Sequence, residues 1–244
     1  ESWARQMAVE IGKPIRHGRE EVQRTARNLR EVLRLARRAE AASAGAAQVR
    51  HRPLGVVAVI TPWNNPLAIA LGKIAAALAY GNAVVWKPSP AGMGVARRLM
   101  GELAAAGVPD GVVEMVSGDH TVAQRLAMAR GVDAVTFTGS DLGGYAMQEA
   151  CGRRVIPLQA ELGGNNAAIV WDDADLGVAA AQIASGAFAF AGQRCTANRR
   201  AIVAEGVYES FLGEGAAATA RIAWGDPLEE ETEIGPLISV AHRD

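Results

Sequence analysis

The sequence predicts an α/β fold built on a parallel sheet, and two observations carry this prediction. Between residues 52 and 160, short β-branched runs alternate with Ala-rich stretches of helical spacing. Three of these helical stretches end at or near a glycine, where helices commonly stop. Consecutive strand–helix–strand units place their strands side by side in parallel, with helices on both faces of the sheet.

The expected elements follow one another in a regular order. Strands are expected at residues 56–60, 83–86, 112–116 and 134–137, and helices at 67–80, 95–106, 121–129 and 142–150. A second α/β unit is expected to follow, with strands at 155–159, 167–171 and 201–204 and helices at 175–190 and 207–222. Parallel sheets bind ligands at the carboxyl ends of their strands, so the residues just after each strand are expected to form the functional site.

Composition excludes several classes of protein. The chain has 244 residues, of which 50% are hydrophobic and 21% charged, as in ordinary globular proteins. It holds no apolar run long enough to cross a membrane, and no membrane partner is expected. Its two cysteines cannot form a disulfide framework, which favours a reducing, cytoplasmic setting. The four histidines show no ligand spacing, so no metal site is expected.

The positive charge of the chain is concentrated in its first part. Residues 1–52 carry 12 basic and 6 acidic side chains, and a helix is expected at 20–40 with arginines on several faces. This pattern could indicate a helix that binds nucleic acid or a membrane surface. Because no aromatic residues interleave the arginines, a solvated basic face is the favoured interpretation, and no nucleic-acid partner is expected.

The chain starts with neither a Met nor a signal peptide, and its end lacks the turn and capping residues of a natural domain end, so the chain is interpreted as a fragment. The Ala-rich stretch at residues 41–47 is the best candidate for a junction between domains.

Cys195 is the first candidate for chemistry. It follows Gly-Gln-Arg at residues 192–194, after a predicted helix, where glycine lets the backbone bend and a substrate approach. A nucleophilic cysteine needs an accessible loop and a partner base. The alternative, that Cys195 is a small core residue, stays open on this observation alone.

Glu161 and Asn64 are the next candidates. Glu161 follows an apolar strand and precedes Leu-Gly-Gly, and burial at a strand end would raise its pKa toward that of a general base. Asn64 lies in Pro-Trp-Asn-Asn-Pro at residues 62–66, where its amide could donate to an oxyanion. The alternatives are that Glu161 is a strand-end residue that caps the next segment and that Asn64 has a turn role.

The order of five motifs decides between these alternatives. Pro-Trp-Asn at 62–64, Lys-Pro-Ser at 87–89, Phe-Thr-Gly-Ser at 137–140, Glu-Leu-Gly-Gly at 161–164 and Gly-Gln-Arg-Cys at 192–195 follow one another in the order of the aldehyde dehydrogenase superfamily. The chain resembles this superfamily over most of residues 52–238, including Glu-Ile-Gly-Pro-Leu at 233–237.

The resemblance implies three regions: a leading helical segment at 1–51, a Rossmann-like NAD(P)-binding domain at 52–160, and the N-terminal part of an α/β catalytic domain at 161–244. The C-terminal half of the catalytic domain would be missing. The implied activity is that of an oxidoreductase that converts an aldehyde to a carboxylic acid with NAD or NADP. The full-length form is expected to be a homodimer or homotetramer.

The resemblance also implies the site residues. Cys195 would attack the aldehyde and form a thiohemiacetal and then a thioester, Asn64 would stabilise the oxyanion, and Glu161 would activate water. The residues implied at the cofactor are Ile60, Thr61, Pro62, Trp63, Lys87, Ser89, Pro90, Gly118, Phe137, Thr138, Gly139, Ser140, Gly144, Leu162 and Gly163.

The chain departs from the family pattern at two positions. Pro90 stands where many members place a Glu that holds the adenosine ribose, which leaves the choice between NAD and NADP open. Asn165 stands where Lys is commoner.

Three rival functions remain: a CoA-acylating aldehyde dehydrogenase, a nucleotide-independent thiol hydrolase, and an inactive nucleotide-binding fragment.

Overall fold

A computed structural model of the chain describes residues 1–40, 43–44, 47–48 and 50–243. These residues form two compact units, which are described separately. Glu20–Leu162 form one unit, called the sheet unit below, and Glu1–Arg19 together with Gly163–Asp244 form the other, called the cysteine unit. Helix α2 (Ile15–Glu40) begins in the cysteine unit and continues into the sheet unit. The domain roles expected from the sequence stay a prediction.

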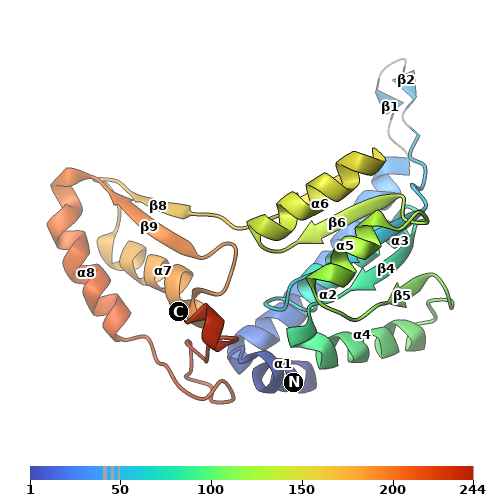
Figure 1. Ribbon diagram of the computed structural model, residues 1–244. Helices are drawn as coiled ribbons and strands as arrows, with labels where there is room; N and C mark the ends of the chain where they lie inside the picture. The colour runs from blue at the N-terminus through green and yellow to red at the C-terminus, as the bar shows by residue number, and fades with distance from the viewer. Residues whose placement is uncertain (41–42, 45–46, 49, 244) are drawn as a thin grey trace. The chain divides into compact units, whose positions relative to one another are not determined.

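Within the described residues, the sheet unit is built on one parallel sheet of five strands (Figure 1). Along the sheet the order is β5 (Val113–Met115), β4 (Ala83–Lys87), β3 (Val56–Ile60), β6 (Ala134–Thr138) and β7 (Leu158–Glu161). The first strand along the chain therefore lies in the middle, as in doubly wound nucleotide-binding sheets. This arrangement confirms the predicted fold class.

Helices connect these strands, as the alternating pattern predicted. They are α3 (Ala68–Ala79), the short 3-10 helix η1 (Pro90–Gly92) with α4 (Met93–Ala105), α5 (His120–Met128) and α6 (Asp141–Arg154). Side chains from β3 and β6 pack against α5 and α6 in a core that includes Ile60, Val135, Ala127, Met147 and Cys151. Successive residues of a strand face opposite sides, so Thr136 of β6 faces away from this core, toward α3.

One predicted strand was misplaced. The sequence indicated a strand at 155–159, but α6 continues to Arg154 and β7 begins only at Leu158. Val155 ends the helix in the left-handed region, with φ 55° and ψ 44°. A β-branched residue rarely adopts this conformation, so its position in a Val-Ile pair was misleading.

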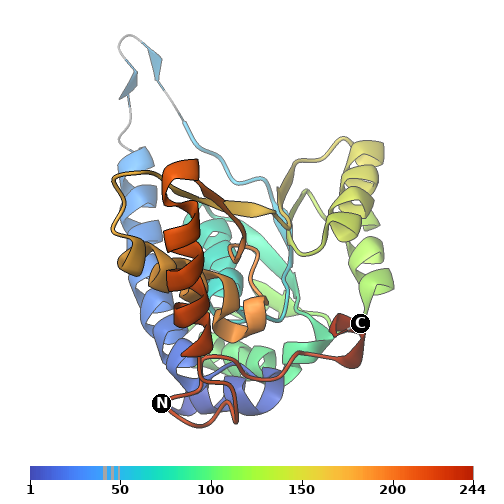
Figure 2. The same ribbon diagram turned by 90° about the vertical axis from the view of Figure 1, so that its left-hand side faces the viewer.

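The cysteine unit contains a second, smaller sheet. Strands β8 (Asn166–Val170) and β9 (Asn198–Val203) pair in parallel, and α7 (Leu176–Phe188) connects them through the 3-10 helix η2 (Ala189–Gly192). The 3-10 helix η3 (Glu205–Val207) and α8 (Tyr208–Ala220) follow, and α7 and α8 lie side by side in both views (Figure 2). Val170, Ala180 and Phe211 form a buried hydrophobic cluster in this unit.

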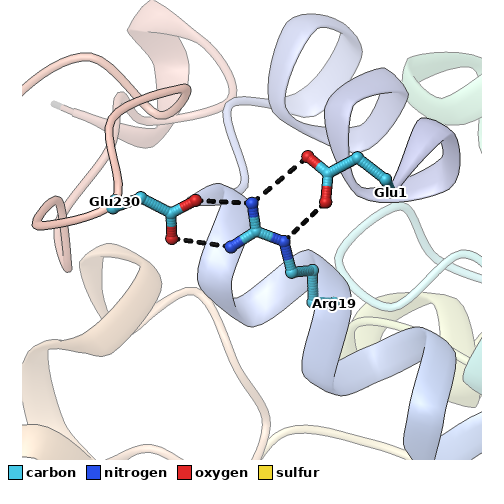
Figure 3. Close-up of polar contacts among 3 residues, drawn as sticks. All are labelled: Glu1, Arg19 and Glu230. Carbon is cyan, nitrogen blue, oxygen red and sulfur yellow. Dashed lines mark hydrogen bonds and ion pairs between the residues drawn. The ribbon is translucent and has the colours of Figure 1, made fainter.

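The start of the chain packs against the segment at 224–238. Helix α1 (Ser2–Ile11) ends at Gly12, where a Cβ would lie 2.6 Å from Cγ of Pro236. Arg19 donates hydrogen bonds to both Glu1 and Glu230, as Figure 3 shows. Arg19 thereby holds the pKa of both carboxyl groups below their usual range. Packing at Pro236 and the ion pair of Arg19 with Glu230 thus attach the segment at 224–238 to the start of the chain.

Two short strands and one helix complete the description. Strands β1 (Ser43–Ala44) and β2 (Ala47–Gln48) pair antiparallel, and the predicted junction at 41–47 falls largely outside the described residues. The 3-10 helix η4 (Val240–His242) lies near the end of the chain. Among the residues that the structure describes, no helix is both long and apolar enough to cross a bilayer.

The start of α3 depends on a buried carboxylate. Glu21 of α2 is 1% exposed, and its Oε1 accepts hydrogen bonds from the N–H groups of Leu67 and Ala68, both at 2.9 Å. These N–H groups belong to the first turn of a helix and lack partners within it. Glu21 therefore caps α3 from a different helix.

We expect Glu21→Ala to lower the free energy of unfolding by about 2–3 kcal/mol, because two buried N–H groups lose a charged acceptor. The measurement is chemical denaturation followed by circular dichroism. Glu20→Ala, at the exposed neighbouring position, should change the free energy of unfolding by less than about 0.5 kcal/mol. Equal effects of the two substitutions would contradict the capping role.

Candidate active site

A pocket lies at the carboxyl ends of the central strands of the sheet unit. Its volume is about 640 Å³, and its walls come from the loops after β3, β4, β5 and β6. The central strand β3 lies between β4 and β6. The connection after β3 runs toward β4 and the connection after β6 runs the other way, toward β7, which opens a crevice between the two loops.

Most of the predicted cofactor residues lie around this pocket. It is lined by Ile60, Thr61, Pro62, Trp63, Lys87, Ser89, Pro90, Phe137, Thr138, Gly139 and Ser140. Four further predicted residues, Gly118, Gly144, Leu162 and Gly163, are not among its lining residues. Gly144 and Leu162 instead pack against each other, because a Cβ on Gly144 would lie 2.5 Å from Cδ2 of Leu162.

The pocket also has lining residues that sequence reasoning missed, among them Asp119, His120 and Gln124 at the start of α5. Asp119 accepts hydrogen bonds from the N–H and the hydroxyl of Thr121, at 2.9 Å and 2.7 Å, and so caps α5. The sequence held a signal for this cap, because Asp119 lies between a predicted strand and a predicted helix, and Asp is a preferred residue at the start of a helix.

Thr138 presents an unused hydroxyl to the pocket. Its residue is 8% exposed, and among the described residues no group lies within hydrogen-bond distance of its Oγ1. A buried polar group without a partner costs free energy, which a bound ligand can recover. Beside it, Gly139 and Gly143 have no room for a side chain, because Cζ of Phe137 would lie 2.5 Å and 2.7 Å from their Cβ atoms.

The start of α6 adds backbone donors to the same wall of the pocket. Ser140 caps this helix, accepting a hydrogen bond from the N–H of Gly143 at 3.2 Å. The N-terminus of a helix carries partial positive charge and favours phosphate groups. Lys87 contributes a buried ammonium group whose pKa is lowered by that burial. The pocket therefore combines an apolar wall with groups that can hold an anion and a hydroxyl.

Glu161 lies at the end of β7 and is exposed, so the expected burial of this carboxylate is wrong for the described chain. The reason is that β7 is an edge strand of the sheet. Glu161 is nevertheless oriented, because Nε2 of Gln159 donates a hydrogen bond to its Oε1 at 2.9 Å.

Lys73 of α3 extends this network and was missed by sequence reasoning. Its Nζ donates to Oγ1 of Thr136 at 2.7 Å and to Oε1 of Gln159 at 2.6 Å. Burial lowers the pKa of Lys73 to about 8, while the charge of Glu161 acts in the opposite direction. The sequence held a signal for Lys73, because it is the one charged residue in the apolar stretch 67–80.

Asn64 and Cys195 are the other two candidates. Asn64 is half-buried in the loop after β3, in the sheet unit, whereas Cys195 is exposed in the cysteine unit. Their catalytic roles, and that of Glu161, stay predictions. Cys151 is buried in the sheet-unit core, where burial raises the pKa of its thiol.

Backbone strain precedes Cys195. Phe190, Ala191 and Gly192 are all left-handed, with φ of 55°, 54° and 65°. Such a conformation costs a non-glycine residue roughly 1–2 kcal/mol, and it persists only where the surroundings enforce it. The neighbouring Arg194 donates to the carbonyl groups of Ser185 and Gly186 at the end of α7, at 3.2 Å and 2.9 Å, so a structural role accounts for its position.

The lowered pKa of Lys73 predicts a pH dependence of stability. The unfolded chain keeps this proton up to about pH 10.4 and the folded chain releases it near about pH 8, so the unfolded state binds more protons in between. The stability of the wild type should therefore rise with pH across this window, relative to Lys73→Met. Denaturation midpoints of both proteins from about pH 7 to about pH 10 test this, and a constant difference would contradict it.

Comparison with known proteins identifies the family. The family model described as "Aldehyde dehydrogenase family" matches residues 1–244. The chain is 45% identical over 188 residues to the alpha-ketoglutaric semialdehyde dehydrogenase of Bacillus subtilis, which covers 77% of this chain and 38% of that protein. The chain thus spans well under half the length of this relative.

Two solved structures are similar in fold. The NAD-dependent aldehyde dehydrogenase from Sinorhizobium meliloti has a TM-score of 0.90 and 37% identity, over 99% of this chain and 50% of that one. The NADP-dependent glyceraldehyde-3-phosphate dehydrogenase from Bacillus halodurans, complexed with NADP, has a TM-score of 0.89 and 35% identity, over 98% and 52%. The sheet, the ordered motifs and these matches together show that the chain belongs to the aldehyde dehydrogenase family.

Proposed function

We propose that the complete protein oxidises an aldehyde to a carboxylic acid with NAD or NADP as the hydride acceptor, and that Cys195 is its nucleophile. The observation that carries the proposal is an exposed cysteine beside a strained backbone segment, in a chain of this family. Strained residues cluster at functional sites, where the surroundings hold a geometry that an isolated loop would not adopt.

The pocket of the sheet unit fits a nicotinamide dinucleotide. The Thr138 hydroxyl without a partner, the backbone donors at the start of α6 and the buried Lys87 are groups that could bind such a cofactor. Lys87 and Ser89 would hold the adenosine ribose, and Gly139 and Ser140 the pyrophosphate. When bound, the cofactor accepts the hydride that leaves the substrate.

Pro90 bears on the choice of cofactor. It lines the pocket where the family resemblance places a carboxylate that would repel a 2′-phosphate. The carboxylate of Asp119 also lines the pocket, but it is engaged in capping α5. Pro90 carries no charge that would repel NADP, whereas Asp119 keeps its negative charge while it caps α5, because its hydrogen bonds to Thr121 lower its pKa; both nicotinamide cofactors stay in the proposal.

The chemistry begins at the sulfur of Cys195. Its thiolate adds to the aldehyde carbon, forming a C–S bond, and the carbonyl oxygen becomes an oxyanion. The side-chain amide of Asn64 and the N–H of Cys195 are the proposed donors to that oxyanion, and loss of one such donor typically costs about 3 kcal/mol of barrier. Departure of the hydride from the same carbon leaves a thioester on Cys195.

Hydrolysis of the thioester is assigned to Glu161. Its carboxylate takes a proton from water, the hydroxide adds to the thioester carbon, and the C–S bond breaks to release the acid and the thiolate. Gln159 and Lys73 act as positioning residues in this step, because Gln159 bonds both the carboxylate and the Lys73 ammonium group.

Two further expectations belong to the complete protein. We propose an aldehyde as its small-molecule partner and a homodimer or homotetramer as its assembled form, in the cytoplasm. The relatives act by name on different aldehydes, including alpha-ketoglutaric semialdehyde and geranial, so the proposal does not specify the aldehyde.

We expect Cys195→Ala to lower turnover of aldehydes by more than roughly a thousandfold, because no thiohemiacetal can form. Glu161→Gln should instead release one equivalent of reduced cofactor in a burst and then stall at the thioester. Absorbance of the reduced nicotinamide, followed in the complete protein with a panel of aldehydes, measures both effects.

Cys151→Ala serves as the control, since Cys151 is buried in the core, and its turnover should stay within about twofold of wild type. Turnover that requires CoA would replace the proposal by the CoA-acylating function. An unaffected Cys195→Ala variant would contradict the proposal outright.

A further inference from the structure

Asn166, the first residue of β8, holds the backbone at the cysteine. Its Nδ2 lies 2.6 Å from the carbonyl oxygen of Cys195 and 3.0 Å from that of Ala197. Both carbonyl groups can only accept hydrogen bonds, so the atom that faces them must be the amide nitrogen. Its two N–H bonds are thus committed to the backbone on either side of Thr196.

The fit around this amide is tight. A Cβ on Gly164 would lie 3.1 Å from Oδ1 of Asn166 and 3.6 Å from the carbonyl oxygen of Cys195. This close approach explains the second glycine of the Leu-Gly-Gly segment after Glu161. A larger residue at Gly164 would push the amide against the cysteine loop.

The other side of the loop is fixed by β9. The pairing of β8 with β9 shifts register after Asn166, so that Asn166 pairs with Asn198 and Ala167 with Arg200. Arg199 is therefore the extra residue of a bulge, which redirects its side chain. Its Nη2 donates to the carbonyl oxygen of Gly192 at 3.0 Å.

The segment at 233–238 braces the loop as well. The N–H of Phe190 donates to the carbonyl oxygen of Glu233 at 2.9 Å. The side chain of Gln193 accepts from the N–H of Ile238 at 2.9 Å and donates to the carbonyl oxygen of Pro236 at 3.3 Å. Arg199 and the segment at 233–238 thus hold the residues before Cys195, and Asn166 holds the backbone from Cys195 onward.

We propose that Asn166 is a positioning residue for the nucleophile. By fixing the carbonyl groups of Cys195 and Ala197, its amide sets the direction of the Cys195 side chain. This inference rests on the proposed role of Cys195. A displacement of about 1 Å at a reacting atom can slow a reaction roughly a hundredfold, although binding is unchanged.

The test compares Asn166→Ala and Asn166→Asp with wild type in the complete protein. Asp keeps the shape of Asn but turns an oxygen toward two carbonyl oxygens, so it separates donation from volume. We expect kcat with propanal or betaine aldehyde to fall roughly 10- to 100-fold in both variants, while KM for the cofactor stays within about twofold. Asn165→Ala, at the exposed neighbouring position, should leave kcat within about twofold.

Hydrogen exchange separates this inference from the proposed function. Exchange of the peptide that contains Cys195 and Ala197 should become faster in both Asn166 variants, and stay unchanged in Asn165→Ala. If wild type oxidises aldehydes but both Asn166 variants keep its kcat, the positioning role is overturned. If wild type oxidises no aldehyde, the proposed function fails, and unchanged exchange in the variants would overturn the positioning role as well.

Discussion

The pairing of β3 with a parallel strand on each side decides where chemistry is possible in the sheet unit. Ile60 is in register with Lys87 of β4 and with Phe137 of β6, so the three strands end at one edge. The residues that follow are therefore neighbours in space, although they are up to 80 positions apart in the chain. The strand order then opens the pocket at this edge, because the connection after β3 runs to β4 on one side and the connection after β6 runs to β7 on the other.

A second constraint is that polar side chains buried in an Ala-rich, apolar interior need hydrogen-bond partners. Lys73 and Glu21 both form hydrogen bonds, Lys73 with side chains of β6 and β7 and Glu21 with the backbone at the start of α3. Each thereby connects elements that are distant in sequence. Thr138 differs from them, because its buried hydroxyl has no partner among the described residues. A polar group that the protein itself does not satisfy, at the carboxyl end of a central strand, marks the place where a ligand is expected.

In the cysteine unit the corresponding constraint is the strained backbone that precedes Cys195. Three successive left-handed residues are held by hydrogen bonds from Arg199 of β9 to the carbonyl group of Gly192 and from the N–H of Phe190 to the carbonyl group of Glu233. The Glu-Ile-Gly-Pro-Leu motif is thereby explained by its contacts. Gly235 has no room for a side chain, since a Cβ there would lie 2.4 Å from the carbonyl oxygen of Gly12.

Strand and helix positions could be predicted from the sequence because apolar periodicity and glycine stops are local signals. Val155 defeated the prediction because its left-handed conformation is imposed by the end of α6. The exposure of Glu161 could not be predicted, since it depends on β7 being an edge strand and hence on strand order. The hydrogen bonds of Asn166 join it to residues 29 and 31 positions further along the chain, which no local pattern reveals.

If the carboxyl edge of the parallel sheet is a dinucleotide site, the chain should bind NAD or NADP in a calorimetric titration. The comparison is wild type against Thr138→Val, which removes the hydroxyl and keeps the shape. We expect wild type to bind at least one of the two nucleotides and the valine variant to bind it roughly fivefold more weakly, which corresponds to one hydrogen bond of about 1 kcal/mol. Absence of binding to either nucleotide, or equal affinity of the two proteins, would show that this edge of the sheet is not the dinucleotide site.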